Sequence, residues 1–155
     1  MKRMLMATVL CASAVAVLVG AGAPAGKAKA KKAAVVWSAA DMKWAEVPNV
    51  AGVKVAKLWG DMGKGAYGCI TKFDSGLKHD LHTHSADLRT VVISGAFWYA
   101  AEGGPVKQLG PGSYLMIPGG VKHTSGCTDA GECMFFMLQA AKFDMMPVGA
   151  ATPGK

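Results

Sequence analysis

The sequence has no internal repeat with a period of about 20–50 residues, and residues 38–44 are its single short helix-like stretch. These absences exclude solenoid repeats and helical bundles. The sequence also has no acidic residue before residue 33, where six of its 17 Lys and Arg residues lie. The remainder holds eleven basic and ten acidic residues, a net charge of about +1. This balance excludes a basic nucleic-acid-binding face, so no nucleic-acid partner is expected.

Residues 1–25 have the organisation of a secretory signal peptide. Lys2 and Arg3 form the charged start, residues 4–19 are apolar, and small residues follow over 20–25. An uncleaved membrane anchor is the alternative, because the run is almost long enough to span a bilayer. The Ala- and Gly-rich end favours cleavage. We therefore expect an exported protein, periplasmic or secreted, with no stable membrane span when mature and a basic flexible linker over residues 26–36.

Beyond the linker, short apolar runs alternate with turn residues. The expected strands are 43–47, 53–59, 66–73, 81–84, 88–94, 96–101, 106–109, 113–117, 121–124 and 133–138. The 20 glycines suit tight hairpins better than long helices. The pattern predicts one all-β domain over residues 37–148, a small antiparallel double-sheeted β-barrel, followed by a disordered tail over residues 149–155.

Three histidines are the candidate metal ligands of this domain. His82 and His84 are two residues apart, so on a strand both side chains point to the same face. His123 lies about 40 residues further on, in a second strand-like run that follows a turn at residues 118–120. Three imidazoles that converge inside a barrel would bind a metal, because neutral imidazole suits Zn, Cu, Fe and Ni.

The spacing of these histidines resembles the two motifs of the cupin superfamily. The matching positions are Gly76, His82, His84 and Gly95 in the first motif, and Gly112, Pro118, Gly120 and His123 in the second. Cys127 stands where the second motif has asparagine. The motifs cover about 50 residues, and the strand pattern extends the resemblance to about residues 44–148. The resemblance implies a cupin or jelly-roll barrel, a fold that hosts many activities.

One position departs from the family pattern. Leu88 stands where the first motif has its metal-binding glutamate, and a leucine cannot bind a metal. The resemblance therefore implies a site of His82, His84 and His123 alone, as in the cupin dioxygenases that act on thiols and diketones. The metal would be a divalent transition metal: Fe, Zn, Mn, Ni or Cu. The alternatives are a barrel that has lost its metal, and a bulge that lets Asp87 replace the glutamate.

Other side chains near the motifs each have two interpretations. His79 is expected to be a solvated loop residue rather than a fourth ligand. Arg89 is expected to be an exposed charge rather than a clamp for a substrate carboxylate. Cys127 either lies near the metal or forms a disulfide with Cys133 across a hairpin, and an oxidising compartment favours the disulfide. Cys69 would then remain as a buried thiol.

Two function classes are compatible with these residues. The first is a metalloenzyme, dioxygenase-like or isomerase-like, that acts on a small polar substrate at open metal positions. Its catalytic residues remain unassigned, because the motifs place neither Glu102 nor Asp87 at the site. The second is a binding or sensing cupin that holds a metal or small ligand without turnover. The resemblance also implies a homodimer formed through an edge strand, with residues 53–59 as the candidate contact strand.

Overall fold

The computed structural model describes residues 33–149. The predicted signal peptide, most of the predicted linker and the last six residues of the predicted tail lie outside this range. Across the described part, no helix is long and apolar enough to cross a membrane. The helix-like stretch at residues 38–44 contains a single turn of 3-10 helix, Ala39–Asp41.

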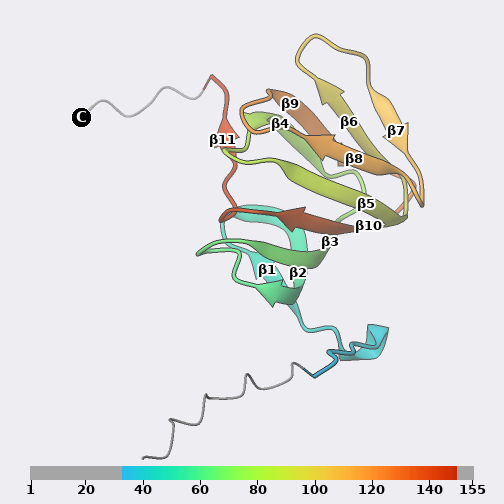
Figure 1. The fold of residues 1–155 in the computed structure, drawn as a ribbon. Coiled ribbons are helices and arrows are strands. Elements are labelled where there is room, and N and C mark those ends of the chain that lie inside the picture. The colour runs from blue at the N-terminus through green and yellow to red at the C-terminus, as the bar shows by residue number, and fades with distance from the viewer. Residues whose placement is uncertain (1–32, 150–155) are drawn as a thin grey trace, which may run out of the picture. The chain divides into compact units, whose positions relative to one another are not determined.

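Eleven strands of the described residues form two antiparallel sheets (Figure 1). The strands are β1 (Trp44–Val47), β2 (Val50–Gly60), β3 (Tyr67–Phe73), β4 (Lys78–Thr83), β5 (Leu88–Ser94), β6 (Phe97–Ala101), β7 (Lys107–Leu109), β8 (Tyr114–Ile117), β9 (His123–Cys127), β10 (Cys133–Gln139) and β11 (Met146–Pro147). One sheet has the order β1-β2-β3-β10-β5-β8 and the other β11-β4-β9-β6-β7. The all-β double-sheeted fold predicted from the sequence is confirmed.

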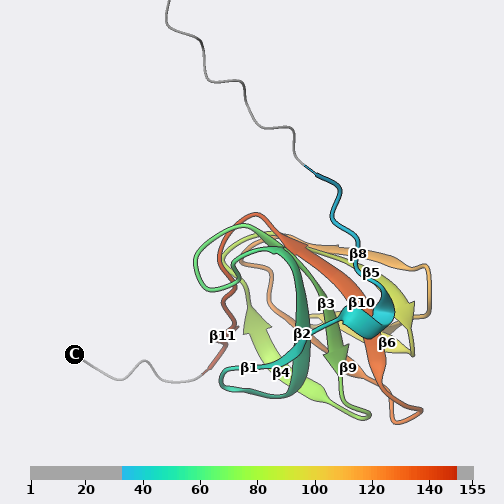
Figure 2. The same ribbon diagram turned by 90° about the horizontal axis from the view of Figure 1, so that it is seen from below.

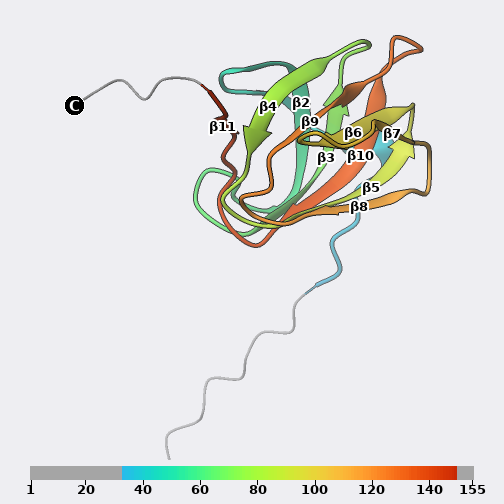
Figure 3. The ribbon, with the colours of Figure 1, turned by 90° about the horizontal axis from the view of Figure 1, so that it is seen from above.

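The core lies between the two sheets, which face each other in the views from below and above (Figures 2 and 3). The core forms because successive side chains of a strand point to opposite faces of the sheet. On β10 the buried residues are Cys133, Phe135, Met137 and Gln139, and the residues between them are partly exposed. Phe135 of one sheet packs against Phe97 of the other, with ring centroids 5.1 Å apart. These contacts hold the two sheets together.

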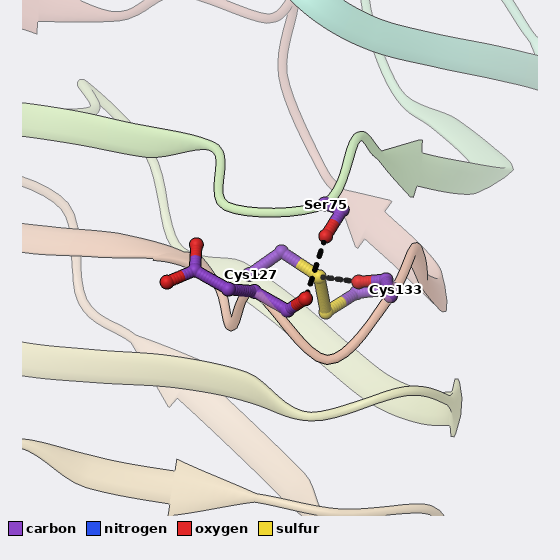
Figure 4. The surroundings of a disulfide bond; sticks show 5 residues. Ser75, Cys127 and Cys133 are labelled. Carbon is purple, nitrogen blue, oxygen red and sulfur yellow. Dashed lines mark hydrogen bonds between the residues drawn. A yellow bond between two sulfur atoms is a disulfide. The ribbon is translucent and has the colours of Figure 1, made fainter.

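A disulfide joins Cys127 at the end of β9 to Cys133 at the start of β10, with Cα atoms 5.8 Å apart (Figure 4). Beside it, the Ser75 hydroxyl donates a hydrogen bond to the Asp129 carbonyl. The predicted pairing is confirmed, but the expected hairpin is wrong. Strands β9 and β10 belong to different sheets, so the bond ties the two sheets together rather than one strand to its neighbour.

The predicted contact strand for a homodimer is not at an edge. Residues 53–59 belong to β2, which pairs with β1 on one side and β3 on the other. Its pairing with β1 covers residues as far as Ala56, so both rows of backbone hydrogen-bonding groups are occupied over residues 53–56, and only the β3 side is occupied over residues 57–59. The edges of the six-stranded sheet are β1 and β8, and those of the five-stranded sheet are β11 and β7.

Candidate metal centre

The three predicted histidines meet inside the barrel. His82 on β4 and His123 on β9 are cross-strand partners, and His84 follows β4 directly. Their exposed fractions are 4% for His82, 4% for His84 and 1% for His123. One ring nitrogen of each lies within 4.8 Å of the others. Two nitrogens bound tetrahedrally to one zinc-sized ion are about 3.4 Å apart, so a small inward shift would seat the ion.

Backbone carbonyls fix the orientation of all three rings. The Nδ1 atom of His82 lies 2.6 Å from the Asp80 carbonyl, and that of His123 lies 2.9 Å from the Val121 carbonyl. The Nδ1 atom of His84 bonds to the Asp144 carbonyl. A carbonyl oxygen only accepts, so each Nδ1 carries the hydrogen and donates it. Each Nε2 is therefore left with a free lone pair, which is the form that binds a metal.

Burial also keeps these rings neutral. Desolvation lowers the pKa of His82 and of His84, although their carbonyl hydrogen bonds oppose the shift. The pKa of His123 falls to about 4, again mainly through desolvation. A metal needs the neutral imidazole. At neutral pH the three rings are therefore already neutral, so metal binding would not have to displace a proton from them.

The fourth position of the family motif provides no ligand. Leu88 is 9% exposed and its side chain lines the cavity beside the histidines. Asp87 instead bonds to Arg89 and accepts the Gly119 amide hydrogen bond, each at 3.1 Å. The alternative in which Asp87 replaces the glutamate is thus wrong, and Arg89 is committed to this outer ion pair. Among residues 33–149, no carboxylate lines the cavity.

The histidines form one wall of a cavity of about 50 Å³ between the sheets. Space on this scale holds a few water molecules or a small ligand. Apart from the histidines and the hydroxyls of Thr71, Thr90 and Ser125, the lining is Val, Leu, Ile, Phe and Met. This lining favours a substrate with an apolar body and few polar groups over the small polar substrate expected from the sequence.

His79 is not the solvated loop residue that the sequence predicted. It lies on β4, is half-buried and lines the cavity. Its ring packs edge-on against Phe73 at 5.0 Å and against His82 at 5.9 Å. Desolvation lowers the pKa of His79 to about 4. His79 does not belong to the candidate metal site, which consists of His82, His84 and His123.

A C-terminal segment that the sequence did not identify supports the site. The Phe143 ring lies 5.6 Å from the His84 ring, and the Phe143 amide donates to the Met62 carbonyl at 2.8 Å. The Asp144 carboxylate accepts the Ser85 amide hydrogen bond at 2.8 Å, beside the Asp144 carbonyl that holds His84. Strand β11 then pairs with β4 alongside His82. This segment therefore positions two of the three candidate ligands.

Glu102, Cys127 and Cys69 do not line the cavity. Glu102 pairs with Lys122 at 3.3 Å on the surface and does not line the cavity. Phe97 lines the cavity, while Trp98 on the opposite face packs over Gly126. Cys127 is committed to the disulfide, which excludes it as a thiolate ligand. Cys69 is a buried free thiol, as expected.

Comparison with known proteins identifies a family and a fold. A family model described as a domain of unknown function, DUF4437, matches residues 23–151. The polyketide cyclase RemF from Streptomyces resistomycificus has a similar structure, with a TM-score of 0.63 at 17% identity over 77% of this chain and 88% of that one. A cupin-like protein from Thermotoga maritima has a TM-score of 0.55 at 22% identity over 65% and 79%. These similarities show the cupin fold.

One curated protein is similar in sequence. The (R)-mandelonitrile lyase of Granulicella tundricola is 32% identical over 72 residues, which are 46% of this chain and 55% of the lyase. The match thus spans about half the length of that enzyme. The DMSP lyase DddQ from Ruegeria pomeroyi is similar in fold, with a TM-score of 0.56 at 21% identity over 75% of this chain and 64% of that one.

Proposed function

Because this chain belongs to the DUF4437 family and has the cupin fold, we propose that it is an exported metal-dependent lyase of small organic molecules. His82, His84 and His123 would hold one divalent transition metal. Their convergence, with all three Nδ1 atoms bound to carbonyls, is the observation that carries the proposal. The Cys127–Cys133 disulfide supports an oxidising compartment outside the cytoplasm.

The donor set fits such a metal. Three neutral imidazoles leave coordination positions free for a substrate, as in catalytic rather than structural sites. When bound, the metal would supply Lewis acidity toward a substrate oxygen. The protein's own contribution is to orient the rings through their carbonyl partners. The apolar lining, including Leu88 and Phe97, would exclude bulk water around the substrate.

The lyase assignment rests on the cavity and on the mandelonitrile lyase relative. Mandelonitrile combines an apolar ring with a hydroxyl and a nitrile, and these groups match the chemistry of the lining, which is largely apolar with one polar wall. Its cleavage breaks the carbon–carbon bond to the nitrile and releases benzaldehyde and hydrogen cyanide, with the hydroxyl proton passing to cyanide. We prefer this reaction to the dioxygenase-like or isomerase-like one expected from the sequence, because this relative points to bond cleavage.

The test is release of benzaldehyde from mandelonitrile, followed by its ultraviolet absorbance. Protein is loaded separately with Fe(II), Mn(II), Zn(II), Ni(II) and Cu(II) and compared with metal-free protein. His84→Ala should abolish the activity, because it removes one ligand. Asp87→Asn is the matched control and should retain it, because Asp87 lies outside the cavity. Equal rates in the His84→Ala and parent proteins would refute a metal-centred reaction.

A second candidate function is metal or ligand binding without turnover. The observation that favours it is Leu88 at the fourth position, together with a cavity that no described carboxylate lines. A general base for proton transfer is then missing from the usual acidic residues. The two functions give different results in the same assay. Stoichiometric metal with no product from mandelonitrile would support the binding protein.

A further inference from the structure

A break in strand pairing turns His79 toward the metal ligands. His79 pairs with Ser125 of β9, and His82 pairs with His123, but the register shifts between these two pairs. Between these pairs, two residues of β4 (Asp80 and Leu81) thus lie opposite one residue of β9 (Thr124). On a regular strand, residues three apart point to opposite faces. The extra residue of the bulge reverses this alternation, so His79 and His82 both line the cavity.

The His79 and Ser125 side chains are uncommitted. Ser125 is 5% exposed, lines the cavity, and is the cross-strand partner of His79. Within the described residues, neither the His79 ring nor the Ser125 hydroxyl has a hydrogen-bond partner, unlike the three ligand histidines. Neither group is a fully buried, unsatisfied polar atom, so both keep access to the space that they line. These two groups are therefore free to hydrogen-bond a ligand in the cavity.

The strand geometry gives the separation between this pair and the metal ligands. Ser125 lies two residues beyond His123 on β9, and two residues of antiparallel strand span about 7 Å. The His79–Ser125 pair thus lies one row along the barrel wall from the His82–His123 pair. The cavity lining around both rows is apolar, with Phe73 against His79. Two polar rows about 7 Å apart can contact both ends of one small molecule.

We infer that His79 and Ser125 form a second polar subsite, which hydrogen-bonds one end of a small ligand whose other end binds at the three-histidine centre. The ligand class is a short molecule with two polar groups three or four bonds apart and an otherwise apolar body. This inference rests on the proposed function and adds to it the shape of the substrate. In the lyase reaction, the group held at the subsite is the nitrile, a hydrogen-bond acceptor.

Propionate and 3-hydroxypropionate are suitable probes, because they differ only in a terminal hydroxyl. Protein is loaded with Co(II), and the dissociation constant of each acid is measured from the visible Co(II) spectrum. In the parent protein, 3-hydroxypropionate should bind about five- to tenfold more tightly than propionate, the effect of one buried hydrogen bond. In His79→Phe, which keeps the aromatic contact with Phe73, this preference should vanish while the Co(II) affinity stays unchanged.

Two further variants control this experiment. Thr90→Val removes a cavity hydroxyl from the opposite sheet and should keep the preference. His79→Gln retains a hydrogen-bonding group and should keep part of the preference for 3-hydroxypropionate. This variant also tests the subsite if His79→Phe does not fold. An unchanged preference in His79→Phe overturns the subsite and leaves the proposed function intact.

Two outcomes of the Co(II) titration would also overturn the inference. Loss of Co(II) binding in His79→Phe alone would make His79 a metal ligand, which contradicts a separate subsite. Absence of Co(II) binding in the parent protein would refute the proposed function, and the inference with it.

Discussion

Acidification tests whether the histidines are held neutral by burial. An ordinary exposed histidine has a pKa of about 6.5, so at pH 5.5 it is about 90% protonated and binds metal about elevenfold more weakly. Three such residues would together lower the affinity about a thousandfold between pH 7.5 and 5.5. His123, with a pKa of about 4, is almost fully neutral at pH 5.5 and contributes almost nothing to this loss.

The expected result is therefore a metal affinity that falls by far less than a thousandfold over this range. The pKa of His82 and of His84 is lowered in the same direction. The affinity is measured by Co(II) titration at pH 7.5, 6.5 and 5.5, with a flexible peptide that carries three exposed histidines as the control. If the protein lost affinity as steeply as the peptide, the account of burial and orientation would be refuted.

The lowered histidine pKa values also predict how the stability of the metal-free protein depends on pH. A folded-state pKa below the unfolded value means that the unfolded chain binds more protons between pH 6.5 and about 4. The free energy of unfolding should thus be highest above pH 6.5 and should fall through that window. Urea unfolding at several pH values measures it, and a stability that rises on acidification would contradict the lowered pKa values.

Three substitutions test other parts of the structure. Replacing both Cys127 and Cys133 by alanine should lower the free energy of unfolding by about 2 kcal/mol, because the loop that they close is short; an unchanged urea midpoint would contradict this. Leu88→Glu should tighten metal binding and destabilise the metal-free protein, because its carboxylate is buried without a partner; a melting temperature measured with and without metal separates the two effects. Gly126→Ala should cost about 1–3 kcal/mol, because its Cβ would lie 2.2 Å from the Leu77 carbonyl oxygen; a normal melting temperature would show that the strand can shift.

The sequence predicted that the three histidines converge, because their positions follow regular strand geometry. His82 and His84 share a face through two-residue spacing, and His123 follows a turn marked by proline and glycine. Strand β5 begins and ends where its apolar pattern does. These features depend on residues close together in the chain, so local pattern is sufficient to find them.

Other features depend on contacts that local pattern does not encode. The bulge in β4 inverts the side of His79, and no glycine or proline marks it between residues 79 and 82. Strand β11 has two residues, too few to show alternation, yet it pairs alongside His82. The disulfide was predicted from spacing, but its role in joining two sheets follows from topology alone.

The most direct test of the metal centre is the metal content of the exported, tag-free protein, purified without chelators and measured by elemental analysis. We expect close to one transition-metal ion per chain in the parent protein and in His79→Phe, and loss of the ion in the His82→Ala/His123→Ala double variant. The element found also selects the metal for the lyase assay. No metal in the parent, even after reconstitution with iron, zinc, manganese, nickel and copper, would contradict the account.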